Sequence, residues 1–163
     1  AVVTIGTING GKANNVIADQ VDMSGTCRSY EPHVRKMLPE AVKRVVHNTA
    51  AAFDCTAEVE YILDLPAVLN DPHLAEIGRR AVEIIAGPEA PVVPPPTGGG
   101  EDFAIYMQEV PGNFFHLGTR NEEKGFVHEW HHPRYDSDER ALPIGAGILA
   151  QSALEFLEER RNA

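Results

Sequence analysis

The sequence is poor in positive charge, in cysteine and in long apolar runs, and each shortage excludes a class of protein. Its 14 Lys and Arg stand against 24 Asp and Glu, which gives a formal net charge of −10. Nucleic acids and anionic membranes both need a basic surface, so we expect neither as a partner. Two cysteines in 163 residues cannot form a disulfide framework. No apolar run approaches the roughly 18 residues that span a bilayer.

Two further features are missing at the N-terminal end. The first residue is Ala1 and not a methionine, and no charged segment followed by an apolar one precedes the strand-like run 1–8. Because no leader is visible, the sequence predicts a cytoplasmic protein. The same opening leads us to expect that 163 residues are a piece of a longer protein.

The first part of the chain predicts two strands, a helix and a third strand. Residues 2–8 are β-rich and run into a turn signal at 9–11, and residues 21–28 alternate polar and apolar side chains. Apolar residues spaced by three and four over 34–52 indicate a helix, and alternation over 57–65 indicates another half-buried strand. The order β-β-α-β is what remains of a ferredoxin-like βαββαβ unit without its first βα pair.

The second part predicts helices on either side of an irregular stretch. Asp71 followed by Pro72 is a typical helix start. Residues 88–100 hold five prolines and three consecutive glycines, which indicates a linker or a site loop. Residues 114–117 predict a short buried strand, a polar loop rich in His follows, and a last helix is expected over 142–157.

The densest group of possible metal ligands lies between His128 and Glu139. Imidazole and carboxylate are ligands that zinc and manganese prefer. His131 comes shortly before Pro133, so we expect it on extended, loop-like backbone. No helical pair of His ligands occurs here, and a catalytic zinc needs at least three protein ligands. Spacing alone therefore favours a solvated polar loop, which can supply one ligand but not a whole site.

A second group follows the proline-rich stretch. The glycines at 98–100 leave backbone N–H groups unshielded, a geometry that can cradle an anion. Glu101 and Asp102, directly behind them, can act in acid–base chemistry or orient a metal-bound His. The alternative is a linker whose two acidic residues cap the start of a helix.

A third group lies around the first two predicted strands. Arg28 projects from the polar face of its strand, where a guanidinium can bind a carboxylate, and Asn15 can donate its amide to a carbonyl oxygen. A surface salt bridge for the Arg and turn chemistry for the Asn are the alternatives. Cys27 and Cys55 have no Cys-His neighbourhood, so we expect both to be buried small apolar residues.

Taken together, these motifs form an ordered series. They are Gly-Gly-x-Ala-x-Asn-Val-Ile at 10–17, Gly-Thr-x-Arg at 25–28, Gly-Glu-Asp-Phe at 100–103, Val-Pro-Gly at 110–112, Leu-Gly at 117–118, His-x-Pro-x-Tyr-Asp at 131–136, Asp-Glu at 138–139 and Leu-Pro-x-Gly-Ala at 142–146. The series resembles the second half of the N-acyl-amino-acid amidohydrolases, the group that holds hippurate hydrolases and auxin-conjugate hydrolases. That group belongs with the aminoacylase-like dinuclear zinc peptidases.

The resemblance implies a mixed α/β fold in two incomplete domains. Residues 1–66 resemble a partial ferredoxin-like lid and dimerisation domain, and residues 67–163 resemble the C-terminal part of a zinc-exopeptidase-like α/β catalytic domain. Members of the family bind two divalent metal ions per full-length subunit, with zinc expected and manganese or cobalt as alternatives. A metal-activated water attacks the amide carbonyl, and a glutamate is the general base.

The resemblance also implies roles for residues of this sequence. His131 matches the final metal ligand, and its neighbour His132 stays open as the alternative. The residues that match substrate-binding positions are Asn15, Arg28, Gly99 and Gly100. Glu101 and Asp102 match positions that orient a ligand or serve the structure.

The family's general base and its other metal ligands match nothing in this sequence. We therefore expect no catalytic residue here, no tightly retained metal, and no hydrolysis by these 163 residues alone. The expected partners are an N-acyl amino acid or small peptide as substrate, the missing N-terminal part of the catalytic domain, and a second copy bound through the lid. The alternative function is a non-catalytic dimerisation or interaction module that pairs through an open sheet edge, with a structural His loop.

Overall fold

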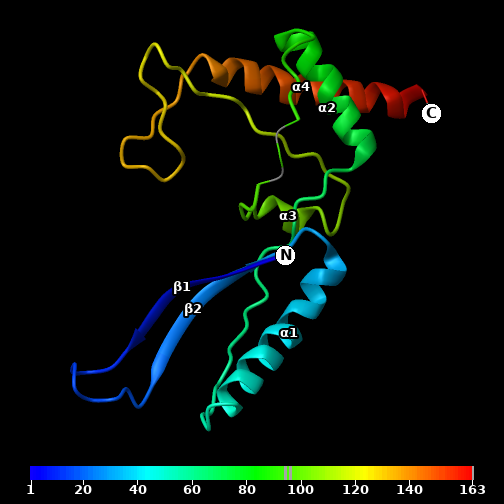
Figure 1. Ribbon diagram of the computed structural model, residues 1–163. Coiled ribbons are helices and arrows are strands. Elements are labelled where there is room, and N and C mark those ends of the chain that lie inside the picture. Colours follow the sequence, from blue (N-terminus) through cyan, green and yellow to red (C-terminus); the bar gives the residue numbers. More distant parts are fainter. Residues whose placement is uncertain (94, 96, 163) are drawn as a thin grey trace. The chain divides into compact units, whose positions relative to one another are not determined.

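The computed structural model describes residues 1–93, 95 and 97–162 (Figure 1). Its elements are β1 (Val2–Gly10), β2 (Val21–Arg28), α1 (Pro32–Ala51), α2 (Pro72–Ala86), α3 (Phe103–Tyr106) and α4 (Ala141–Asn162). The chain divides into two compact units: unit 1 is Ala1–Val68 with Pro96–Ile105, and unit 2 is Leu69–Pro95 with Tyr106–Ala163. Helices and strands occur together, which confirms the mixed α/β class.

In unit 1, β1 and β2 form an antiparallel hairpin, as the sequence predicts. Ile5 pairs with Gly25 and Ile8 pairs with Met23, with a register shift between them at Gly6. Alternate residues of a strand point to opposite faces, so the extra residue returns Ile8 to the face that holds Ile5. The bulge therefore keeps Val3, Ile5 and Ile8 on one face, although every residue of β1 is exposed.

Gly25 is required by the close approach of the two strands. A Cβ atom at this position would collide with the backbone carbonyl oxygen of Thr4 on β1. Because neither atom belongs to a flexible side chain, Gly25→Ala is expected to destabilise the hairpin by about 1–3 kcal/mol. Urea unfolding and amide exchange of β1 measure this loss. Gly6→Ala is the control, since its Cβ would come no nearer than 3.9 Å to the Ser24 carbonyl oxygen, and equal losses would contradict the prediction.

The strand predicted over 57–65 is not formed. Among the described residues the sheet has two strands, and residues 57–65 carry no ladder. Their alternation is still visible, because Ala57, Val59 and Tyr61 are half-buried while Glu58 and Glu60 are exposed. Alternating polar and apolar residues are typical of a half-buried strand, but a strand also needs a neighbouring strand with which its backbone forms hydrogen bonds.

The segment 57–65 is held by side chains instead. It runs beside α1 (Figure 1), where Arg35 donates from Nη2 to the Asp64 carbonyl oxygen at 2.6 Å. Partial burial, together with a hydrogen bond to Cys27, raises the pKa of Tyr61 to about 12. Cys27 itself is half-buried and Cys55 is exposed, so the expectation that both are buried is wrong.

Unit 2 is built on α2 packed against α4, which cross in Figure 1. The predicted start of α2 is confirmed, because the Asp71 carboxylate accepts the backbone N–H groups of His73 and Leu74 at 2.9 and 3.0 Å. Arg80 of α2 donates to Glu155 and Glu159 of α4 at 2.9 and 2.6 Å. The residues that the two helices bury are Ile77, Gly78, Ala81, Ala141, Gly145 and Ile148.

The strand predicted over 114–117 is also absent. The Asn70 side chain acts there as a strand neighbour would: its Nδ2 donates to the Phe114 carbonyl and its Oδ1 accepts the Phe114 N–H, both at 2.8 Å. A side-chain amide satisfies one residue of backbone and so does not propagate a ladder.

Two expectations concern segments rather than elements. In the proline-rich stretch 88–100, Pro94 and Pro96 lie outside the described residues, and the remaining residues form no helix or strand. Within the described part of the chain, none of the helices combines the length and the apolar character needed to traverse a bilayer.

Candidate functional site

The His-rich segment of unit 2 is a closed loop that leads into α4. It is the yellow-to-orange stretch of Figure 1. At its base, the Asp138 N–H donates to the Thr119 carbonyl oxygen at 3.0 Å. Further along, Asn121 and Phe126 form a β-bridge around a turn. We call residues 119–140 the His loop. Its two ends therefore lie side by side, joined by the hydrogen bond between Asp138 and Thr119.

Asp138 closes this loop with a buried carboxylate. Only 6% of the residue is exposed. Its oxygens accept from Arg140 Nη2 at 2.5 Å, Asn121 Nδ2 at 2.5 Å and Lys124 Nζ at 3.0 Å. The hydrogen bonds from Arg140 and Asn121, aided by Lys124, hold the pKa of Asp138 well below its usual range. The carboxylate is thus ionised and fully partnered.

The lowered pKa of Asp138 gives the His loop a defined acid sensitivity. A carboxylate whose folded pKa lies below its unfolded value of about 3.9 stabilises the fold above that value and loses this effect as the pH falls toward the folded pKa. The backbone amide signal of Phe126, on the arm that Asn121 ties to Asp138, is therefore expected to keep its position from neutral pH to about pH 4 and to shift only in stronger acid. NMR titration measures this, and Asp138→Asn should abolish the acid step; a step above pH 5 that persists in the variant would contradict the assignment.

The three neighbouring imidazoles of the loop differ in what they contact. His132 accepts the Arg134 N–H on Nδ1 at 3.0 Å, and its ring stacks on His128 with centroids 4.1 Å apart. Desolvation, with the charges of His132 and Arg134, lowers the pKa of His128. His131 is exposed, and no hydrogen-bond, ion-pair or ring partner for its imidazole occurs among the described residues. Of the three rings, that of His131 is the one without any such partner.

The backbone at His131 is unusual. Its φ of 66° lies in the left-handed region, so the expected loop is present but the expected extended conformation is wrong. The preceding residue, Trp130, contacts His116 with ring centroids 5.3 Å apart, and His116 in turn meets Phe114 edge-on at 5.4 Å. This row of rings places the tip of the His loop against the segment that Asn70 holds.

The residues of the loop do not form a metal centre by themselves. Within the described ranges, no three His, Cys, Asp or Glu side chains are grouped so as to hold a metal ion. A catalytic zinc takes three protein ligands. His131 has the donor chemistry of one such ligand, and the others have no counterpart near it.

In unit 1, the structure brings two of the sequence motifs together. The Arg28 guanidinium donates from Nη1 to the carbonyl oxygen of Gly98, at the start of the three glycines. Glu101 accepts the Phe103 N–H at 3.2 Å and so caps α3. Asp102 is exposed beside it, and Asn15 is exposed in the connection between β1 and β2. Gly99 and Gly100 continue the loop that Arg28 contacts, while Asn15 has no such contact with them.

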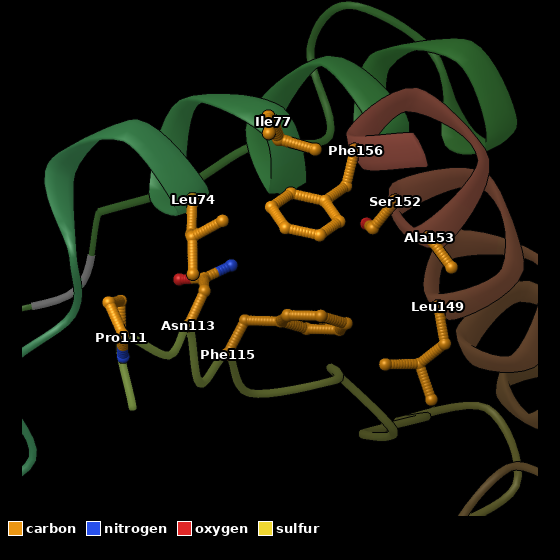
Figure 2. Close-up of a pocket in the computed structure, with 9 residues that line it drawn as sticks. All are labelled: Leu74, Ile77, Pro111, Asn113, Phe115, Leu149, Ser152, Ala153 and Phe156. Carbon is orange, nitrogen blue, oxygen red and sulfur yellow. The ribbon is translucent and has the colours of Figure 1, made fainter. Parts of the chain in front are cut away.

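An apolar hollow of about 290 Å³ in unit 2 is not evident from the sequence motifs (Figure 2). It lies between α2 and α4, and the rings of Phe115 and Phe156 project into it. Its polar lining is Asn113 and Ser152, and the Ser152 hydroxyl already donates to the Ile148 carbonyl oxygen at 2.8 Å. The hollow offers no ionisable group, so it is not a reactive site.

Comparison with known proteins gives a consistent family match. The model of "Peptidase family M20/M25/M40" matches residues 2–155. A probable hydrolase of Synechocystis is 38% identical over 95% of the chain and 40% of its own length. N-acetylcysteine deacetylase of Bacillus subtilis is 35% identical over 97% of the chain and 40% of its own length. An IAA-amino acid hydrolase of Arabidopsis thaliana is 34% identical over 99% of the chain and 37% of its own length.

A solved structure matches in the same way. The Bacillus subtilis YXEP protein, described as a dinuclear metal binding peptidase, has a TM-score of 0.83 and 34% identity over 96% of this chain. The alignment covers 42% of the YXEP chain. The chain thus spans about two fifths of the length of the curated relatives it matches.

Proposed function

Because the chain belongs to peptidase family M20/M25/M40, we propose that it is the C-terminal part of a metal-dependent amidohydrolase. The substrate class is N-acyl amino acids or small peptides, whose amide bond is hydrolysed. The observation that carries this proposal is the family match over residues 2–155. Relatives named as an N-acetylcysteine deacetylase and as an IAA-amino acid hydrolase support the N-acyl amino acid as the substrate.

We assign His131 the role of one metal ligand. Its free imidazole supports this role, whereas the neighbouring His132 already uses Nδ1 for the Arg134 N–H. Two divalent ions, zinc with manganese or cobalt as alternatives, are proposed for the longer protein, in line with the dinuclear description of YXEP. Such ions, when bound, activate water for attack on a carbonyl. The other ligands and the general base are assigned to the part that this chain lacks.

Residues 1–66 are proposed to be part of a lid and dimerisation domain, and 67–163 part of the catalytic domain. Arg28 and Asn15 are assigned to substrate binding with the loop at Gly99 and Gly100. The contact between Arg28 and the Gly98 carbonyl supports a shared site, because it places the guanidinium at this loop. The exposed apolar side chains of the hairpin support a second copy as a partner. The cytoplasmic location expected from the sequence stays a prediction.

The proposal is tested by supplying what the chain lacks. The part of Bacillus subtilis N-acetylcysteine deacetylase that this chain does not match is joined to the chain, and we call this protein the chimera. Hydrolysis of N-acetylcysteine by the metal-loaded chimera is expected, with the intact relative as the positive control. A folded, metal-loaded chimera without hydrolysis would favour the alternative, a non-catalytic interaction module with a structural His loop.

A further inference from the structure

We propose that Asp138 is a positioning residue that fixes both arms of the His loop at the start of α4 and thereby holds the backbone that presents His131. The positioning role rests on the proposed function only through the assignment of His131 as a ligand. The attachment of both arms of the loop by Asp138, which we call the clamp, is a property of this chain and is tested without any metal.

The first arm of the loop is attached through backbone and side chains. The Asp138 N–H donates to the Thr119 carbonyl oxygen at 3.0 Å, and Asn121 Nδ2 donates to the Asp138 carboxylate at 2.5 Å. The backbone carbonyl oxygen of Asn121 accepts the Phe126 N–H at 2.8 Å, and the side-chain Oδ1 of Asn121 accepts the Lys124 N–H at 3.0 Å. Lys124 then returns to Asp138 through Nζ, at 3.0 Å. One carboxylate therefore orders the whole turn.

The second arm is attached at the helix. Arg140 donates to Asp138 from its backbone N–H at 3.2 Å and from Nε at 2.9 Å. The Asp138 carbonyl oxygen accepts the N–H of Ala141, the first residue of α4, at 3.0 Å. Among the described residues, Asp138 is the one charged side chain that is buried. Its position is accordingly set by α4 and not by solvent.

The backbone between these arms needs such a clamp. His131 is one of two residues other than glycine with a positive φ in the described chain, at 66°. A conformation of this kind persists only where the surrounding structure determines it. The His loop is held at its base by Asp138 and at its tip by the contact of Trp130 with His116, at 5.3 Å. Removing the base clamp should leave the tip contact to hold His131 alone.

The chain contains its own reporter of this arrangement. Trp130 is the sole tryptophan of the sequence and immediately precedes His131. Its fluorescence therefore reports the tip of the loop, while the exchange of the Phe126 amide reports the arm that Asp138 holds. Both are measured on the chain as it is, without metal or substrate.

The test compares Asp138→Asn with Asp136→Asn. Asp136 is the matched control, because it lies in the same loop, is exposed, and accepts only the Ser137 N–H, at 2.8 Å. Asp138→Asn is expected to raise the Phe126 exchange rate by on the order of tenfold or more and to increase acrylamide quenching of Trp130. The exchange of α4 amides and the circular dichroism should stay as in the unmodified chain. Equal behaviour of the two variants would overturn the proposal.

Two further measurements keep the test decisive. If Asp138→Asn does not fold, Asn121→Ala removes one donor to the carboxylate and leaves Arg140 in place; unchanged Phe126 exchange in that variant overturns the proposal. In the chimera, Asp138→Asn is expected to lower metal affinity by about 10- to 100-fold, as for other residues that orient a ligand. Unaltered affinity there overturns the role toward His131. A chimera that binds no metal counts against the proposed function, while the fluorescence and exchange results still decide the clamp.

Discussion

Purified by itself, the 163-residue chain is expected to retain no stoichiometric zinc, manganese or cobalt and to release no product from N-acetylcysteine. The chimera is expected to retain the metal and to release the product. The physical reason is the number of ligands. Zinc in catalytic sites takes three protein ligands and keeps one open position. The described part of the chain brings no three ligating side chains together, and the His131 imidazole stands alone. A single exposed imidazole cannot compete with water and buffer for a metal ion.

Within the chimera, His131→Ala is expected to lower kcat by on the order of a thousandfold. A bound metal contributes several kcal/mol of charge stabilisation to the transition state, and about 4 kcal/mol corresponds to that factor. Mass spectrometry measures whether the variant has lost metal, and initial rates at saturating substrate measure the fall in kcat. The same change at His132 decides between the neighbouring rings, and the larger loss identifies the ligand.

The matched control is His47→Ala. His47 is an exposed residue of α1 with no role in the proposed site, so its replacement should leave both the metal content and the rate of the chimera unchanged. Stoichiometric, tightly held zinc in the chain alone would contradict the count of ligands. A fully active His131→Ala chimera would contradict the assignment of His131.

What the sequence could predict depended on how local the determining contacts are. The start of α2 was predictable, because Asp71 and Pro72 act on their own helix. The strands expected over 57–65 and 114–117 were not, because a ladder needs a neighbour that alternation does not supply. In the first case the described chain has no such neighbour, and in the second the Asn70 amide serves one residue only.

The candidate site shows the same division. The motif at 131–136 picked out His131, but nothing in that motif indicates which imidazole is already hydrogen-bonded. Asp138 belonged to an Asp-Glu pair of no assigned role. Its burial and its partners Asn121 and Lys124 come from a loop that folds back on itself, and no spacing rule describes that closure. The nearby Arg140 was the one local signal that a carboxylate is paired there.

Replacing Ile77 with Ala is expected to destabilise unit 2 by about 2–5 kcal/mol. Ile77 is 2% exposed and lies on α2, facing α4. Its removal loses buried apolar area and opens a cavity beside a hollow that Ile77 already lines. Few large apolar side chains of these two helices are buried, and in the described range they are Ile77 and Ile148.

This loss is large compared with the total free energy of unfolding expected for unit 2. Domains are stable by about 5–15 kcal/mol, and a unit with so few buried side chains belongs at the low end, so the substitution should remove much of the cooperative transition. Urea unfolding followed by circular dichroism measures it as a fall in the midpoint at an unchanged slope. Ile84→Ala is the control on the same helix, since Ile84 is 62% exposed and should cost far less. If both variants unfolded at the same urea concentration, the α2–α4 contact would not be the core of unit 2.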